Sequence, residues 1–193
     1  ELIDKLKMPN NGNLTALLNE LEACEFIRSY NPFGKARKDK MFQLIDQFSL
    51  FYLNFMKDRK SYAKDYWLQK IGTAEYFAWS GYAFETVCLH HIDQLVEALG
   101  ISGMLSTPCC WSYRPAEALK KDPDADVDMK TGGQIDLLID RADKTISICE
   151  MKYAQGEYEI TKSYAKHVED RLRTFRKITK TKKKGKKMTL TIT

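Results

Sequence analysis

The chain has 193 residues, of which 44% are hydrophobic and 30% are charged. This composition is typical of a globular protein and excludes a disordered one. No run of about 18 uncharged apolar residues occurs, so the sequence predicts no membrane-spanning helix. The N-terminal ELIDKLKMPN carries charges where a signal peptide needs its apolar stretch, and we therefore expect a cytoplasmic protein that does not bind membranes.

Two further features of the whole chain guide the interpretation. The sequence begins at Glu1 rather than at a methionine, so we expect a fragment of a longer protein. The five cysteines show no CxxC spacing, a pattern that favours reduced thiols over a zinc site or a disulfide framework.

The charge of the chain is uneven. Its net charge is only +5, but residues 177–187 contain seven lysines. Such a run is either a solvated loop or a patch that contacts phosphates, since clustered lysines release counterions from nucleic acid. Under the second hypothesis the run supplies these candidate nucleic-acid-binding residues: Lys182, Lys183, Lys184, Lys186 and Lys187.

Residues 1–46 predict a helix, a turn, a second helix and a two-stranded hairpin. Asn13 is the expected N-cap of the second helix, which carries an apolar stripe of leucines. This order is that of a winged helix, a DNA-binding architecture whose wing contacts backbone phosphates. Lys35, Arg37 and Lys38 at the hairpin tip are then the candidate phosphate contacts. The alternative is that the wing packs on protein.

Residues 47–66 predict a helical connector rich in aromatic side chains. Phe48, Phe51, Tyr52 and Phe55 recur at helical spacing, which favours packing in a core or between domains.

Residues 67–193 predict a second domain with both helices and strands. The expected fold class of the whole chain is therefore α+β, with the order αβββαβ and a mixed sheet in this second domain. The expected elements are a helix over 73–99, a strand within 101–113, strands over 134–141 and 145–153, a helix over 160–178 and a strand over 188–193.

The two strands around the turn RADK bring charged residues together. If Arg141 pairs with Thr145, opposed residues lie with their Cβ atoms about 4.5–5.5 Å apart. The register then sets Asp136 opposite Glu150, and Gln134 opposite Lys152. Because it lies beside Lys152, Gln134 is also a candidate catalytic residue.

This cluster lies on a sheet face that is otherwise apolar, where two carboxylates repel and are costly to desolvate. A divalent cation removes the conflict, and Mg²⁺ or Mn²⁺ prefers oxygen ligands. Lys152 is placed to orient or deprotonate an attacking water, or to stabilise charge on a phosphate. Glu85, beside the apolar face of the helix over 73–99, is expected to point inward as a third carboxylate.

The spacing D-x(13)-E-x-K and the order of elements resemble the PD-(D/E)XK nuclease superfamily. The resemblance implies a restriction-endonuclease-like fold in which Glu85, Asp136 and Glu150 hold the metal and Lys152 is the catalytic lysine. Ile135 stands where the family pattern has proline, a change that many relatives tolerate.

Nearly the whole chain resembles the C-terminal half of prokaryotic AAA+ ATPases. The resemblance implies that an ATPase domain of the same protein precedes a winged helix and a restriction-endonuclease-like domain. It also leaves a homo-oligomer open, because AAA+ relatives commonly form rings. The P-loop GxxxxGK[ST] is absent, so we do not expect this chain to bind ATP. The resemblance rests on these segments: GNLTALLNELEACEFIRSYNPFGKARKDKMFQLIDQFSLFYLNF, WSGYAFETVCLHHIDQL and GGQIDLLIDRADKTISICEMKY.

These observations predict a metal-dependent endonuclease domain that acts on DNA phosphodiester bonds. The alternative is a module of the same fold that docks the ATPase on DNA or on a protein without turnover. A third interpretation is purely structural, with Asp136, Glu150 and Lys152 forming an ion-pair network at a sheet edge.

Overall fold

The structure is a computed structural model that describes residues 2–9, 11–35, 40–58, 64–115, 132–180 and 185–192. It has the predicted α+β class and divides into two compact units. This division differs from the predicted domain ranges of 1–46, 47–66 and 67–193. The first unit comprises residues 1–30 and 40–71, and the second comprises residues 31–39 and 72–193.

The start of the first unit follows the predicted order of two helices and a hairpin. The N-cap is Asn11 rather than Asn13, because the Asn11 side chain accepts a hydrogen bond from the backbone N–H of Leu14. Leu14 is buried but Leu17 is exposed, so the predicted leucine stripe is only partly covered. The elements are α1 (Leu2–Leu6), α2 (Gly12–Ala23), β1 (Ile27–Tyr30) and β2 (Met41–Leu44), and the two strands pair antiparallel.

The predicted connector belongs to the first unit and forms α3 (Gln47–Phe55) and α4 (Tyr66–Lys70). Phe55 is buried, and its ring and that of Phe51 meet Trp67 at centroid distances of 5.2 and 4.9 Å. Packing in a core, one of the two alternatives predicted for the four aromatics of α3, does not hold for Phe48 and Tyr52, which are exposed. At about 100° per residue, the two i, i+4 pairs lie on separate ridges of the helix.

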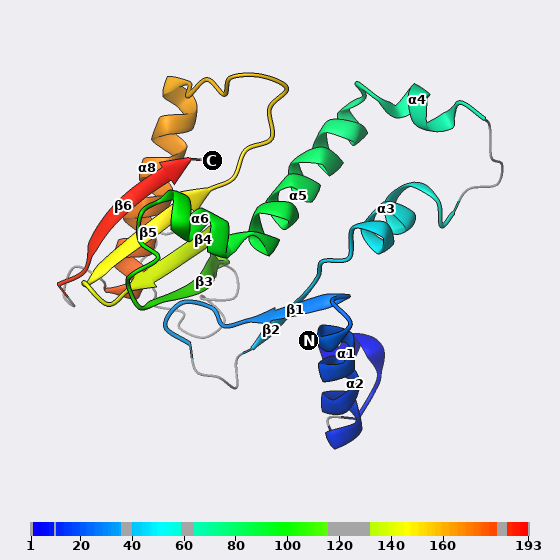
Figure 1. Cartoon of the computed structure of the whole chain (residues 1–193), viewed down its shortest axis with the longest axis horizontal. Helices are drawn as coiled ribbons and strands as arrows, with labels where there is room; N and C mark the ends of the chain where they lie inside the picture. The colour runs from blue at the N-terminus through cyan, green and yellow to red at the C-terminus, as the bar shows by residue number, and fades with distance from the viewer. Residues whose placement is uncertain are drawn as a thin grey trace. The chain divides into compact units, whose positions relative to one another are not determined.

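The second unit is built on one mixed sheet with the strand order β3-β4-β5-β6 (Figure 1). Neighbouring strands are antiparallel except β5 and β6, which are parallel. A parallel neighbour needs a crossover connection, and helix α8 (Lys162–Thr179) supplies it. The strands are β3 (Ser106–Tyr113), β4 (Gly133–Arg141), β5 (Thr145–Glu150) and β6 (Lys187–Ile192).

The helix predicted over 73–99 is two helices, α5 (Ala74–His90) and α6 (Ile92–Ala98). The break falls at His91, whose backbone dihedrals of −110° and 34° are not helical. With this division, the described helices and strands of the second unit otherwise follow one another in the predicted order.

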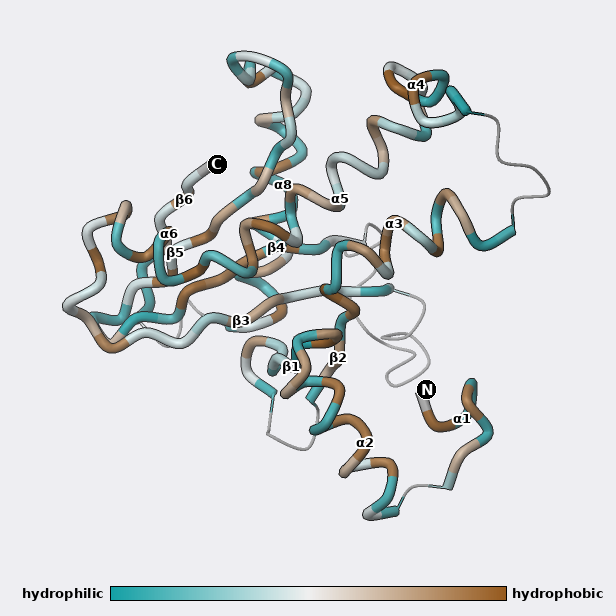
Figure 2. Tube along the Cα trace, turned by 45° about the vertical axis from the view of Figure 1, so that its right-hand side comes forward, coloured by the Kyte–Doolittle hydropathy of each residue, from teal (hydrophilic) through white to brown (hydrophobic). Residues whose placement is uncertain are grey.

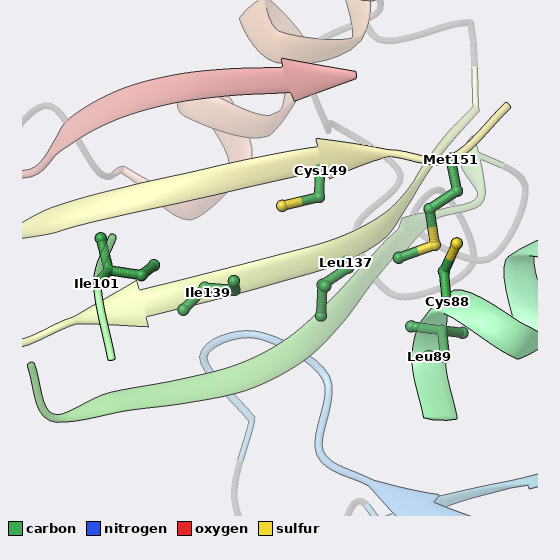
Figure 3. Packing of buried hydrophobic residues seen from close by; sticks show 7 residues of the cluster. All are labelled: Cys88, Leu89, Ile101, Leu137, Ile139, Cys149 and Met151. Carbon is green, nitrogen blue, oxygen red and sulfur yellow. The ribbon is translucent and has the colours of Figure 1, made fainter. Parts of the chain in front are cut away.

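Helices cover both faces of this sheet, with α6 and α8 on opposite sides (Figure 1). The alternation of side chains along β4 and β5 explains the two hydrophobic clusters, and these strands carry much of the hydrophobic colour in Figure 2. In the cluster on the α5–α6 side, Cys88 and Met151 point toward one another (Figure 3). That cluster contains Cys88, Leu89, Ile101, Leu137, Ile139, Cys149 and Met151, and the α8-side cluster contains Cys109, Trp111, Ile135, Leu138, Ile146, Ile148 and Phe175.

A register shift interrupts the pairing of β3 with β4 next to Asp136. Cys109 pairs with Leu138, whereas Trp111 pairs with Ile135. The β4 strand thus has one extra residue, as in a β-bulge, and this explains why Ile135 and Leu138 share the α8-side cluster despite their odd separation. The irregularity lies where the charged residues gather.

Candidate active site

The predicted pairing of β4 with β5 is confirmed. Leu137 pairs with Cys149, and Asp140 pairs with Ile146, as the register from the RADK turn requires. One residue beyond the pair of Leu137 and Cys149, the same register brings Asp136 next to Glu150. Alternation along β5 then aims Glu150 at the face covered by α8.

Asp136 is a half-buried carboxylate, with its side chain 12% exposed. Its Oδ2 accepts a hydrogen bond of 3.4 Å from the backbone N–H of Met151 and lies 3.9 Å from Nζ of Lys152. Burial and the negative charge of Glu150 raise the pKa of Asp136, while the ammonium of Lys152 opposes that shift. The site therefore disfavours the charged form of Asp136 and would gain from an additional cation.

Glu150 is the most enclosed charge of the site, with only 1% of its side chain exposed. Nη1 of Arg171 lies 2.6 Å from each of its two carboxylate oxygens. The Tyr164 hydroxyl donates a 3.4 Å hydrogen bond to Oε2, and Nζ of Lys152 lies 3.6 Å from the same oxygen. Burial and the adjacent Glu150 raise the pKa of the Tyr164 hydroxyl, so this phenol stays a hydrogen-bond donor.

Arg171 and Tyr164 were not anticipated from the sequence. Both lie on α8, outside the β4–β5 hairpin whose register predicted the site. A signal was present, because Arg171 falls at i+3 from Val168, on the apolar face of an amphipathic helix. A cation on such a face needs a buried anion, and Glu150 is that anion.

Lys152 lies between the two carboxylates, and 29% of its side chain is exposed. Its ammonium also lies 5.7 Å from the centroid of the Tyr164 ring, a cation–π distance. These contacts fix the position of the ammonium while leaving part of it open to solvent. The three residues of the predicted D…E-x-K motif are therefore together.

The other two predicted catalytic residues have different surroundings. Glu85 is half-buried on α5, and burial together with the charge of Glu85 raises the pKa of the Cys88 thiol. Gln134 is exposed and pairs with Ser112 of β3. Among the described residues, no three His, Cys, Asp or Glu side chains are close enough to form a metal-binding group, so Glu85 does not complete one with Asp136 and Glu150.

The donor set nevertheless fits one magnesium or manganese ion. Mg²⁺ is commonly held by one or two carboxylates, with water completing its shell. Asp136 offers a partly exposed carboxylate whose ionised form is disfavoured by its surroundings. Glu150 offers a second carboxylate, although Arg171 already contacts both of its oxygens.

The predicted nucleic-acid contacts are only partly described. Lys35 and Lys187 are exposed, whereas Lys186 is half-buried and forms an ion pair with Asp140. The remaining candidates lie outside the described residues: Arg37, Lys38, Lys182, Lys183 and Lys184.

Phe33, at the start of the hairpin loop, packs on β3 and α8 of the second unit. The backbone N–H of Phe33 donates a 2.8 Å hydrogen bond to the carbonyl of Cys110 on β3. Its ring lies 5.2 Å from that of Phe175 on α8, and Nζ of Lys186 lies 5.7 Å from the Phe33 centroid. Residues 31–39 accordingly belong to the second unit.

Comparisons with protein families, with curated proteins and with solved structures find no match for this chain. In the part of the chain that the structure describes, no helix is both long enough and apolar enough to span a bilayer.

Proposed function

We propose that the second unit is a metal-dependent nuclease domain that acts on DNA phosphodiester bonds. The observation that carries the proposal is the meeting of Asp136, Glu150 and Lys152 at one end of a mixed sheet. Their spacing and the αβββαβ order support the resemblance to PD-(D/E)XK nucleases. The resemblance to the C-terminal half of AAA+ ATPases supports an ATPase domain of the same protein as partner.

In this proposal each residue has a role that follows from its surroundings. Lys152 is partly exposed beside both carboxylates, so its ammonium orients the attacking water and stabilises the charge that develops on the phosphate. Asp136 and Glu150 are the residues that would hold the metal. A bound Mg²⁺ or Mn²⁺ would supply Lewis-acid polarisation of the phosphate and lower the pKa of a bound water.

Binding of DNA is the other part of the proposal. The winged-helix interpretation of residues 1–46 and the lysines of residues 177–187 supply the expected phosphate contacts. Lys35 and Lys187 are exposed, whereas Lys186 is held in an ion pair with Asp140. Exposed lysines bind phosphate as mobile point charges, and this mode of binding is strongly sensitive to salt.

A specific observation favours a second candidate, a module that binds DNA or protein without turnover. Arg171 neutralises Glu150 at 2.6 Å, so the buried carboxylate has a counter-charge without any metal. A buried ion pair of this kind can have a purely structural role and needs no metal to balance its charge. The two candidates therefore differ in whether the cluster of Asp136, Glu150 and Lys152 turns over substrate.

The experiment that separates them measures cleavage of plasmid and single-stranded DNA by the 193-residue chain in Mg²⁺ or Mn²⁺. The test variants are Asp136→Asn and Lys152→Ala. Glu169→Gln and Lys166→Ala are matched controls, since both remove a charge from exposed positions on α8. The nuclease proposal expects metal-dependent cleavage that both test variants lose and both controls retain.

A different outcome would support the binding module. In that case the wild-type chain cleaves neither DNA, yet binds it with an affinity that falls steeply with salt. Both test variants would bind DNA as the wild type does, because neither residue is then needed for the contact. Cleavage that persists in Asp136→Asn and Lys152→Ala would refute the assignment of the site.

A further inference from the structure

The contact between Arg171 and Glu150 has an unusual geometry for an ion pair. A single nitrogen, Nη1, lies 2.6 Å from both carboxylate oxygens, so one positive centre faces the whole carboxylate. Oε2 also accepts from the Tyr164 hydroxyl and lies 3.6 Å from Nζ of Lys152. A carboxylate has about four lone-pair sites, so these neighbours occupy most of what Glu150 can offer.

A buried carboxylate needs a counter-charge, and Arg171 is the closest cation to Glu150 in the described site. A divalent cation on the same oxygens would repel the guanidinium at contact distance. The two cations therefore exclude one another from Glu150, because each satisfies the same charge through the same atoms.

Arg171 reaches Glu150 through a space that Gly133 leaves open. A Cβ at Gly133 would lie 3.2 Å from Cγ of Arg171 and 3.3 Å from the ring of Trp111, which is closer than ordinary van der Waals contact. The aliphatic stem of Arg171 thus packs against the start of β4. Its side chain is still 23% exposed, so the guanidinium has access to solvent without unfolding of α8.

We propose that Arg171 is a built-in competitor for the metal, which it excludes from Glu150 until a divalent cation displaces it. The inference rests on the proposed function for the identity of the competing ligand, a divalent cation held by Asp136 and Glu150. It makes Arg171 a positioning residue rather than a catalytic one. It also assigns α8 the role of setting how tightly the site binds metal.

The test measures Mn²⁺ affinity directly, from the loss of the electron paramagnetic resonance signal of free Mn²⁺. Arg171→Gln removes the competing charge, and we expect about tenfold tighter Mn²⁺ binding than in the wild type, since a charge-assisted contact is lost from the metal-free state. Arg173→Gln is the matched control. It removes the same charge from the same helix, but Arg173 is 77% exposed and pairs only with Asp170 among the ion pairs described.

A second variant tests whether the ion binds at Asp136. Adding Asp136→Asn to Arg171→Gln removes a proposed metal ligand, and we expect the tightening to disappear. If Arg171→Gln fails to fold by circular dichroism, Arg171→Met carries the test. It keeps an aliphatic stem to pack beside Gly133 but removes the charge, so tighter binding than in the wild type is again expected.

The opposite result is equally clear. Folded Arg171→Gln or Arg171→Met that binds Mn²⁺ no more tightly than the wild type and Arg173→Gln would overturn the inference. The cleavage assay decides the proposed function separately. Wild-type cleavage with no tightening in the Arg171 variants refutes only the competition, whereas tightening without any cleavage refutes only the nuclease.

Discussion

The ion pair between Arg171 and Glu150 leads to a quantitative prediction for stability without metal. In Arg171→Gln, Glu150 stays buried with 1% exposure and loses its closest counter-charge. Breaking a buried pair in this way costs about 3–5 kcal/mol of unfolding free energy. Lys152 and the Tyr164 hydroxyl still reach Oε2, so we expect the lower end of that range, about 3 kcal/mol.

The reverse substitution should cost less. In Glu150→Gln the orphaned charge is Arg171, whose side chain is 23% exposed and can turn to water, so about 2 kcal/mol is expected. The double variant leaves no buried charge and should lose no more than Glu150→Gln alone. The coupling free energy of the double-mutant cycle is then about 3 kcal/mol.

The assay is urea unfolding followed by circular dichroism in the presence of EDTA. Arg173→Gln, on the exposed side of the same helix, should change the unfolding free energy by less than about 0.5 kcal/mol. A coupling near zero, or equal losses for Arg171→Gln and Arg173→Gln, would refute the argument that Glu150 depends on this guanidinium. In parallel samples without EDTA, Mn²⁺ should stabilise Arg171→Gln more than the wild type, because the metal binds the folded state and we expect it to bind this variant more tightly.

Two other predictions concern the packing and the charge of the second unit. Phe175 is fully buried and meets the rings of Trp111 and Phe33 at 5.3 and 5.2 Å. Phe175→Ala should therefore lower the free energy of unfolding in urea by about 3–5 kcal/mol. Phe48→Ala, at a residue that is 69% exposed, should lower it by less than about 0.5 kcal/mol. Similar losses for the two variants would contradict the assigned core. Burial and Glu150 raise the pKa of Asp136 in the folded state. The protonated carboxyl therefore favours folding at low pH, and this contribution to stability is lost as the pH rises through the folded pKa. In EDTA, Asp136→Asn should therefore be more stable than the wild type at pH 7 but not at pH 3, and a gain that persists at pH 3 would show a cause other than charge.

The sequence was sufficient to predict the β4–β5 hairpin because its information is local. A short turn and a period of two fix which residues oppose one another, so the approach of Asp136 to Glu150 followed from spacing. The surroundings of Glu150 did not follow from spacing. Arg171 reaches it from a helix whose position depends on the crossover to β6, and no local pattern encodes that placement.

The aromatic residues illustrate the same limit. Helical spacing correctly indicated that Phe55 packs inward, but it could not tell which of two adjacent ridges of α3 the core would cover. Phe48 is on the uncovered ridge. The hairpin over residues 25–46 was likewise predictable from its two strands, whereas the contact of its loop residue Phe33 with Phe175 joins segments from near opposite ends of the chain.

That last contact bears on how this protein can be divided. The second unit is discontinuous, because residues 31–39 belong to it while the strands β1 and β2 that flank them belong to the first. A truncation that begins at Gly72 would remove Phe33 and uncover part of the Phe175 ring and the carbonyl of Cys110. Transfer of residues 72–193 to another protein by a single recombination in the gene would likewise leave residues 31–39 behind. The two units are therefore expected to be inherited together rather than to move as separate modules.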